Sequence, residues 1–475
     1  MKLNIARITP IGFGEDQIEA TNRINKFLND PDEYEFTLSG SAGTGKTHML
    51  KWIVNNLCNF PVCPTAPTHK AVRVIEKTLN RKGKTLQSLH GMRPNMDLST
   101  FSISNPKFDP KGIEHIKSYK LVIIDEASMI TDSIYELNKS RAKQYGTKIL
   151  YVGDHLQHNP IQTSKAKGKV FTEVKNKYTL NKIMRQEEGN PLLELFPLIR
   201  EDIIKGTSKF LEYIFLNRSN MIDNVGYKLL PENKFNDELD EYFELNRITT
   251  DLDYARVIAY TNKMVGVNNQ YIRNKLLDSP KDILVKQDIL TSYTTFVDEF
   301  NYPIIINSED YYINTIRPYV NHLDIKTYAI NLQSAFDGRL TNTIQVVDHT
   351  DKSFATYYKI LNHLHKEATS ANKTDRGSKW KAYFKFKESI LCMISFPLDD
   401  SNNNQIVKKD IDYAYSITSH KSQGSTFKNV FIDLRDMLYY QTKTGKYRKR
   451  FDMDMVNRLI YVAMSRASNK VIMKL

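Results

Sequence analysis

The hydrophobic residues of the first 180 positions form two kinds of pattern. Residues 119–128 (YKLVIIDEAS) and 148–154 (KILYVGD) are continuous apolar runs that end in acidic residues, as expected for buried parallel strands whose carboxyl ends carry a site. The run EFTLSG (residues 35–40) leads through a glycine-rich loop into residues 47–57, where apolar side chains recur at helical spacing. These patterns predict an α/β fold built on a parallel sheet.

The pattern changes along the chain and indicates four parts. Residues 91–118 are polar and turn-rich, which predicts a small inserted hairpin. A second α/β pattern starts near residue 256 and resumes at residue 412, while short aromatic and β-branched strands and a helical arm lie between. The expected division is a first α/β domain over 1–90 and 119–178, a hairpin over 91–118, a second α/β domain over 179–280 and 411–475, and an inserted β module with a helical arm over 281–410.

Composition narrows the class of protein. The formal net charge of +13 favours a polyanionic partner such as nucleic acid, although a basic solvated surface is the plainer alternative. Cys58, Cys63 and Cys392 form no CxxC pair, so neither a disulfide framework nor a metal site is expected from them. The chain has no signal-peptide pattern at residue 1 and no run of about 18 apolar residues. We therefore expect a soluble protein of the cytoplasm with no membrane association.

The strongest chemical motif is GSAGTGKT at residues 40–47. Its glycines let the backbone wrap a phosphate chain, and the following helix directs its first amide groups at the anion. Lys46 is expected to hold the β and γ phosphates and Thr47 to ligate magnesium. Asp125 and Glu126 end an apolar strand and supply one carboxylate for magnesium and another to activate water. A chance glycine-rich turn is the alternative, and the flanking strand and helix argue against it.

The substrate must be inferred from motifs outside the phosphate loop. They follow one another in the order PTAPTHKA (64–71), TLQSLHG (85–91), GDHLQHNPI (153–161), LNKIMRQ (180–186), SITSHKSQGSTF (416–427) and YVAMSRA (461–467). This series resembles superfamily 1 DNA helicases, and within them the RecD-like group with its Dda-type members. The resemblance covers nearly the whole chain and is weakest at 200–250 and 281–410. It implies two RecA-like P-loop domains and an SH3-like fold for the inserted β module.

The resemblance also implies roles at the nucleotide. Gln17 matches the glutamine that reads adenine, and Gln157, beside Asp154, matches a sensor of the γ-phosphate. Arg185 and Arg466 match two arginines that reach the γ-phosphate from the second RecA-like domain. The nucleotide-binding residues expected in this way are Gln17, Gly43, Thr44, Gly45, Lys46, Thr47, Gln423 and Gly424, and the catalytic residues are Lys46, Glu126, Gln157, Arg185 and Arg466. The cofactors expected are ATP and Mg²⁺, the latter on Thr47 and Asp125.

A second set of matched residues faces nucleic acid. In the first domain it comprises Pro67, Thr68, His69, Lys70, Thr85 and Ser88, and in the second Thr261, Asn262, Thr418, His420 and Lys421. Hydroxyl and amine groups on phosphates carry no base code, so binding is expected to be largely independent of sequence and sensitive to salt. A solvated turn is the alternative for residues 416–427.

Unwinding requires a group that separates the base pairs, here called the wedge, in addition to the residues that hold the single strand, here called the grip. Opening a base pair costs about 1.4 kcal/mol per stacking step, and a stacked aromatic side chain returns roughly 1–3 kcal/mol. The predicted hairpin contains Phe101 and Phe108, and by its distance ahead of the carboxylate pair Phe108 resembles the pin aromatic of Dda-type helicases. The alternative is that either ring only packs within the hairpin. The basic run at 443–450 suits either a phosphate contact or a solvated loop.

These observations predict an ATP- and magnesium-dependent helicase that moves 5′ to 3′ on single-stranded DNA, with the polarity implied only by the resemblance. One alternative is an RNA helicase or a translocase that does not unwind. Another is a non-catalytic scaffold that binds nucleic acid, which the intact set of ATPase residues disfavours. The expected partners are single-stranded DNA, junctions of single- and double-stranded DNA, and a single-strand-binding or replisome protein. We expect a monomer, acting in the host cytoplasm if the chain is viral.

Overall fold

The computed structural model describes residues 8–41, 43–98, 101–103, 106–158, 168–181, 189–297, 303–399, 405–442 and 444–475. Its first sheet is six-stranded and entirely parallel. In spatial order the strands are β3 (Lys84–Thr85), β2 (Val62–Ala66), β6 (Leu121–Ile124), β7 (Lys148–Gly153), β1 (Glu35–Gly40) and β8 (Lys177–Leu180).

The apolar runs of the sequence become the buried central strands of this sheet. In β6, Leu121 and Ile123 contribute to one hydrophobic core, whereas Val122 and Ile124 contribute to another. Successive side chains of a strand point to opposite faces, so an uninterrupted apolar run is what a strand covered on both faces requires. The elements that surround the sheet are α1 (Glu15–Asn29), α2 (Lys46–Leu57), α3 (His69–Leu79), α4 (Leu86–Leu89), η1 (Ile116–Ser118), η2 (Ala127–Met129), α5 (Asp132–Tyr145) and α6 (Lys169–Thr172).

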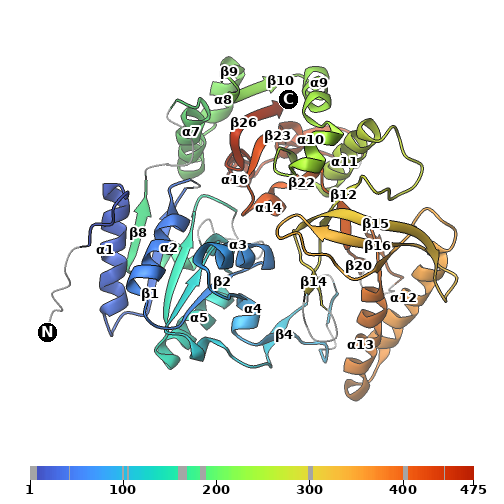
Figure 1. Ribbon diagram of the computed structural model, residues 1–475, viewed down its shortest axis with the longest axis horizontal. Helices are drawn as coiled ribbons and strands as arrows, with labels where there is room; N and C mark the ends of the chain where they lie inside the picture. The colour runs from blue at the N-terminus through green and yellow to red at the C-terminus, as the bar shows by residue number, and fades with distance from the viewer. Residues whose placement is uncertain are drawn as a thin grey trace.

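A second six-stranded sheet is formed from segments far apart in the chain, and the green and red strands lie side by side in it (Figure 1). Its order is β22 (Ser416–Thr418), β11 (Ala255–Ala259), β23 (Phe427–Asp433), β26 (Ala467–Lys474), β10 (Val225–Leu230) and β9 (Ser219–Ile222), and only β9 is antiparallel. Its helices are α7 (Leu192–Lys205), α8 (Lys209–Leu216), α9 (Glu232–Tyr242), α10 (Leu245–Thr250), α11 (Asn262–Leu276), α14 (Ser419–Ser422), α15 (Leu434–Leu438) and α16 (Met453–Met464). The α/β fold class expected from the sequence is confirmed.

The third sheet contains most of the inserted β module. Its order is β18 (Ile390–Leu391), β17 (Ile344–Val347), β16 (Lys326–Ser334), β15 (Asp310–Val320), β12 (Ile289–Ser292) and β21 (Ile411–Tyr413). Two small pairs accompany it, β13 (Phe296–Val297) with β14 (Pro303–Ile305) and β19 (Phe396–Pro397) with β20 (Ile406–Val407). Because β21 pairs with β12, the sheet extends past residue 410, the expected end of the module. One hydrophobic core contains residues of both this sheet and the second sheet, so the module is packed on the second α/β domain.

Two helices form the arm, α12 (Phe354–Ser370) and α13 (Lys373–Ser389), and they lie against one another below the third sheet (Figure 1). Within 91–118, β4 (Met92–Pro94) and β5 (Phe108–Pro110) pair as an antiparallel hairpin. The buried ring of Phe101 contacts the arm, 4.7 Å from the ring of Trp380 between centroids. The hairpin therefore rests on the arm through an aromatic contact.

No helix among the described residues is both long enough and apolar enough to span a bilayer.

Candidate functional site

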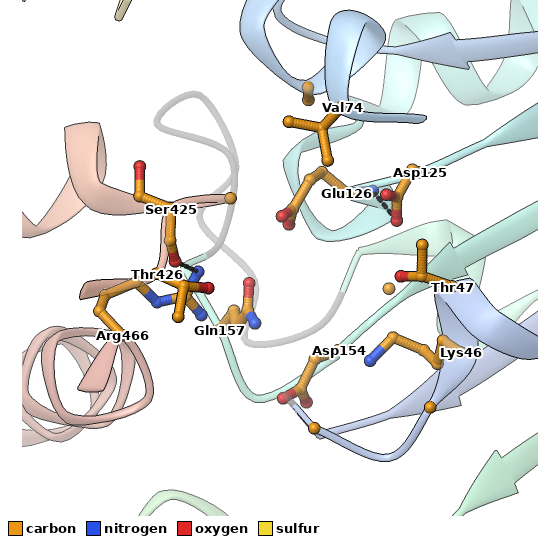
Figure 2. Close-up of a pocket in the computed structure, with 15 residues that line it drawn as sticks. Lys46, Thr47, Val74, Asp125, Glu126, Asp154, Gln157, Ser425, Thr426 and Arg466 are labelled. Carbon is orange, nitrogen blue, oxygen red and sulfur yellow. Dashed lines mark hydrogen bonds between the residues drawn. The ribbon is translucent and has the colours of Figure 1, made fainter. Parts of the chain in front are cut away.

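A cavity of about 400 Å³ lies between the first and second α/β domains. In Figure 2, Lys46, Thr47, Asp125 and Glu126 lie on one side of this cavity, and Ser425, Thr426 and Arg466 face them from the other. The lining residues are Gly43, Gly45, Lys46, Thr47, Ala71, Val74, Asp125, Glu126, Gly153, Asp154, Gln157, Gly424, Ser425, Thr426 and Arg466. The predicted nucleotide residues from both halves of the chain thus meet at one site.

The phosphate loop is tied to the first helix of the domain. Gly45 has φ +77°, and a Cβ atom placed there would lie 2.4 Å from Nε2 of Gln17, so the loop has room only for glycine. Gln17 donates from Nε2 to the carbonyl oxygen of Thr44 at 3.2 Å. The predicted adenine reader therefore also holds the loop that wraps the phosphates.

The side chain of Lys46 folds back over the phosphate loop and contacts its backbone. Lys46 donates from Nζ to the carbonyl oxygens of Gly40 at 2.7 Å and Ser41 at 2.9 Å. Lys46 and Thr47 open α2, whose first amide groups have no partner within the helix and point toward the cavity. An anion in the loop would meet both these amides and the ammonium group.

The two carboxylates at the end of β6 differ in environment. The backbone amide of Glu126 donates to Oδ1 of Asp125 at 2.9 Å. Burial and, to a smaller extent, the adjacent Glu126 raise the pKa of Asp125 to about 6, although the amide hydrogen bond and Lys46 act to lower it. Glu126 has φ +53°, a conformation that costs a non-glycine residue about 1–3 kcal/mol and aims its side chain at the second domain. Such strain is typical of a residue that is held in place for function.

Gln423 bridges the two domains at the cavity. Its Nε2 lies 2.9 Å from Oε2 of Glu126, 3.1 Å from Oε1 of Gln157 and 3.2 Å from Oγ of Ser128. Gly424 follows with φ +77°, and a Cβ atom there would lie 3.5 Å from Oε1 of Glu126. The glutamine of the second domain is thus hydrogen-bonded to the carboxylate that is predicted to activate water.

Helix α16 makes further bonds to the first domain. Tyr461 donates its hydroxyl to Oδ2 of Asp154 at 2.6 Å. Arg458 donates to the carbonyl oxygens of His155 at 3.0 Å and Gln157 at 2.9 Å. Sequence reasoning missed both roles, although Tyr461 opens the YVAMSRA motif and Arg458 lies three residues before it.

Of the two expected arginines, only Arg466 is among the residues that the structure describes. Arg466 lines the cavity, and its guanidinium is hydrogen-bonded to Oγ of Ser465 at 2.7 Å and to the carbonyl oxygen of Ser425 at 3.3 Å. These bonds hold its side chain at the wall of the second domain. Arg185 lies outside the described residues.

Four of the predicted DNA contacts share one local structure. Thr68, Thr85, Thr261 and Thr418 each cap the helix that follows a strand, and each hydroxyl accepts a hydrogen bond of 3.2 Å from the amide three residues later. The strands that precede them are β2 and β3 in the first sheet and β11 and β22 in the second. Since parallel strands end at a common edge, the four caps present helix N-termini, which suit phosphate groups, along that edge of each sheet.

Neighbouring residues extend these caps. Pro67 precedes Thr68 outside the helix, and Ser88 belongs to α4. His69 opens α3, and burial lowers the pKa of its imidazole. Asn262 opens α11 with an exposed side chain.

The two predicted lysine contacts are engaged within the protein. Lys70 donates from Nζ to Oγ of Ser425 at 2.8 Å, across the domain boundary. Lys421 donates to the carbonyl oxygen of Ser292, and its ammonium lies 3.6 Å from the ring centroid of Tyr293 in the inserted module. Burial lowers the pKa of Lys421 to about 7, while Asp310 opposes the shift. In this conformation neither ammonium is an exposed phosphate contact of the kind predicted.

The side chains of two more predicted contacts pack against other side chains, one across the domain boundary and one within the second domain. The exposed ring of His420 stacks on His158 with centroids 4.1 Å apart. Thr261 donates its hydroxyl to Oδ1 of Asp436 at 2.7 Å, and Asp436 also accepts from the amides of Tyr260 and Thr261. Asp436 therefore fixes the start of α11 and ties it to α15.

The chain is similar to known proteins over both α/β domains. Residues 14–213 match the family described as AAA domain, and residues 413–473 match the UvrD-like helicase C-terminal domain. An uncharacterised protein of Acanthamoeba polyphaga mimivirus, R530, is 22% identical over 97% of this chain and 99% of its own. The ATP-dependent DNA helicase dda of Enterobacteria phage T4 is 25% identical over 59% of this chain and 61% of its own. The crystal structure of Pif1 helicase from Candida albicans aligns with a TM-score of 0.50 and 15% identity, covering 98% of this chain and 94% of that one.

The phosphate loop of one parallel-sheet domain and the facing residues of another define an ATPase with two RecA-like domains. The two family models and the helicase relatives support a place among the superfamily 1 helicases, in the group of RecD, Pif1 and Dda. The same relatives support an ATP-dependent enzyme of that group. The family predicted from the sequence is thereby confirmed.

Proposed function

We propose that this protein hydrolyses ATP to move 5′ to 3′ along single-stranded DNA and to unwind duplex DNA ahead of it. One observation carries the proposal: the loop that begins at Thr418 reaches Glu126 through Gln423. A change in the ATP site therefore moves this loop, which the family resemblance assigns to binding the single strand. The DNA substrate and the polarity come from the relatives, which include DNA helicases.

The chemistry of the cavity suits phosphoryl transfer to water. Thr47 and Asp125 supply the oxygen ligands that Mg²⁺ prefers, and both line the cavity. Lys46 neutralises phosphate charge, and Glu126 is placed to accept a proton from the attacking water. Arg466 approaches from the second domain, so full stabilisation of the transition state requires both domains to be closed on the nucleotide.

Two grips on separate domains convert this closure into stepping. The caps at Thr68 and Thr85 belong to the first domain, and those at Thr261 and Thr418 belong to the second. If one grip holds while the cleft closes and the other holds while it opens, the strand advances in one direction. The interdomain bond between Lys70 and Ser425 lies between the grips and supports this coupling.

The hairpin supplies the wedge in this proposal. Phe108 is 39% exposed on β5, whereas Phe101 is 8% exposed and packed on the arm. An exposed ring on a supported hairpin is free to stack on a base at the junction. We assign the wedge to Phe108 and the support to Phe101 and the arm.

The alternatives differ in a direct assay. An RNA helicase would be stimulated by single-stranded RNA, a translocase would hydrolyse ATP on DNA without separating a duplex, and a scaffold would do neither. We expect ATP hydrolysis stimulated by single-stranded DNA but not by RNA, and lost in Lys46→Ala. Undiminished hydrolysis in Lys46→Ala would contradict the site assignment.

We also propose the oligomeric state, the partners and the location of the enzyme. It acts as a monomer on single-stranded DNA and on junctions, beside a single-strand-binding or replisome protein, in the cytoplasm of a cell or of an infected host. The similarity to proteins of a phage and of a mimivirus supports a viral setting.

A further inference from the structure

The hairpin of β24 (Tyr439–Gln441) and β25 (Tyr447–Lys449) has no role in the site described above. It follows β23 and α15 and carries a run of cations without any acidic residue between 439 and 450. Lys446, Arg448 and Lys449 are exposed, and no carboxylate of the described residues forms an ion pair with them. Tyr447 is 54% exposed in the same hairpin. The three cations thus have no ion-pair partner among the described carboxylates, whereas the guanidinium of Arg435 lies 4.6 Å from the ring centroid of Tyr447.

The position of the hairpin follows from the order of the second sheet. Strands β22, β11 and β23 are adjacent and parallel, so their carboxyl ends follow one another along one edge. Thr418 follows the first of these strands, Thr261 follows the second, and the hairpin follows the third after one short helix. A strand of DNA that crosses the two caps in this order next meets the hairpin.

Side-chain contacts connect the hairpin to the second-domain grip. The guanidinium of Arg450 lies 4.6 Å from the ring centroid of Tyr260, and the Tyr260 ring lies 6.2 Å from that of His420. Arg450 also donates to the carbonyl oxygen of Asp436, the residue that fixes Thr261. The hairpin is thus anchored to the same residues that hold the start of α11.

Alternation along the strand determines which cations continue this row. Side chains two residues apart lie on the same face of a strand. Arg448 pairs with Tyr440 across the hairpin, and the guanidinium of Arg450 lies 5.8 Å from the ring centroid of Tyr440, so Arg448 lies on the face of Arg450. Lys446 directly precedes β25, two residues before Arg448. Lys446 and Arg448, both exposed, therefore continue the row of side chains formed by His420, Tyr260 and Arg450.

We infer that the β24–β25 hairpin binds the phosphodiester backbone of the single strand beyond the second-domain grip, through Lys446 and Arg448. The inference rests on the proposed function, because it extends the DNA path of that proposal. Cations that contact backbone phosphates bind a strand without regard to its base sequence. The hairpin therefore lengthens the binding site and slows release of the strand.

The test is the binding of fluorescent oligothymidylates of increasing length, by anisotropy at several salt concentrations. The variant is K446A/R448A, and the matched control is K117A/K143A. Lys117 and Lys143 are exposed and precede the amino ends of β6 and β7, at the edge of the first sheet opposite to its caps. Circular dichroism and ATP hydrolysis without DNA establish that each variant is folded.

Each phosphate contact on a single strand contributes about −0.7 to the slope of log K against log salt. Loss of two contacts should reduce the slope by about 1.4, so the affinity ratio of wild type to K446A/R448A should fall about sevenfold between 50 and 200 mM salt. The difference should appear only with oligonucleotides long enough to pass both caps, and the control should behave as wild type.

Each of three other outcomes would overturn either the inference or the proposed function. If wild type binds DNA and K446A/R448A binds it with the same affinity and slope, the inference is wrong and the proposed function stands. If both double variants lose affinity equally, the effect is one of net charge, and the inference is again overturned. If wild type itself does not bind single-stranded DNA, the proposed function fails first.

Discussion

Replacing Gln423 by alanine tests the bond through which the second domain reaches the ATP site. In the structure its side-chain amide donates to the Glu126 carboxylate at 2.9 Å and lies 3.1 Å from Oε1 of Gln157. A hydrogen bond to a charged group contributes about 1.5–3 kcal/mol. If that energy positions Glu126 in the transition state, its loss lowers kcat by about 10- to 150-fold.

The assay is steady-state ATP hydrolysis at saturating single-stranded DNA. Gln423→Ala should lower kcat with a much smaller effect on KM for ATP, because the amide contacts the catalytic carboxylate rather than the phosphate loop. DNA affinity should be retained, since the contacts of Thr418 with its helix remain. Gln144→Ala, at an exposed glutamine of α5, is the matched control. A kcat within twofold of wild type in Gln423→Ala would refute the reasoning, and so would an equal loss in both variants.

Five further outcomes follow from the geometry. The pKa of Asp125 near 6 predicts that the magnesium-supported rate falls about tenfold for each pH unit below 6, and that added Mg²⁺ moves this limb to lower pH. Because that pKa is raised on folding, the same group adds stability as pH falls from about 6 toward 4, which urea titrations of wild type and Asp125→Asn measure. Phe108→Ala should lower the unwinding rate by about 5- to 150-fold, as expected from 1–3 kcal/mol of stacking, and leave DNA-stimulated ATP hydrolysis intact, with Phe108→Trp retaining unwinding. Arg466→Ala should lower kcat by about 10³- to 10⁵-fold in single-turnover hydrolysis while DNA binding persists. Tyr461→Phe removes the bond to Asp154 and should lower the free energy of unfolding by about 1–3 kcal/mol in denaturant titrations. A rate or a free energy of unfolding that does not change where a change is expected would contradict the role assigned.

Local patterns in the sequence were sufficient for strands β1, β6 and β7 of the first sheet and for the phosphate loop. The run at β6 reads as a strand covered on both faces, and the glycine loop is followed at once by its helix. The sequence pattern of β2 is weaker, because this strand contains Pro64. The neighbouring strand β3 pairs only with Thr65 and Ala66, so Pro64 is not required to donate a hydrogen bond on that side.

Contacts between distant segments could not be derived from local patterns. The bond between Gln423 and Glu126 joins residues 297 positions apart. The sequence gives the charges of Lys70 and Lys421 but not the tertiary packing that directs one to Ser425 and the other to the inserted module. The extension of the third sheet past residue 410 likewise depends on pairing between β12 and β21.

Single-turnover unwinding of two matched duplexes, one with a 5′ single-stranded tail and one with a 3′ tail, tests the central claim most directly. Glu126→Gln serves as the inactive control. The account predicts that wild type opens only the 5′-tailed duplex and that the control opens neither. Opening of only the 3′-tailed duplex would contradict the proposed polarity, and opening of neither while DNA still stimulates ATP hydrolysis would contradict the helicase activity and the wedge role of Phe108.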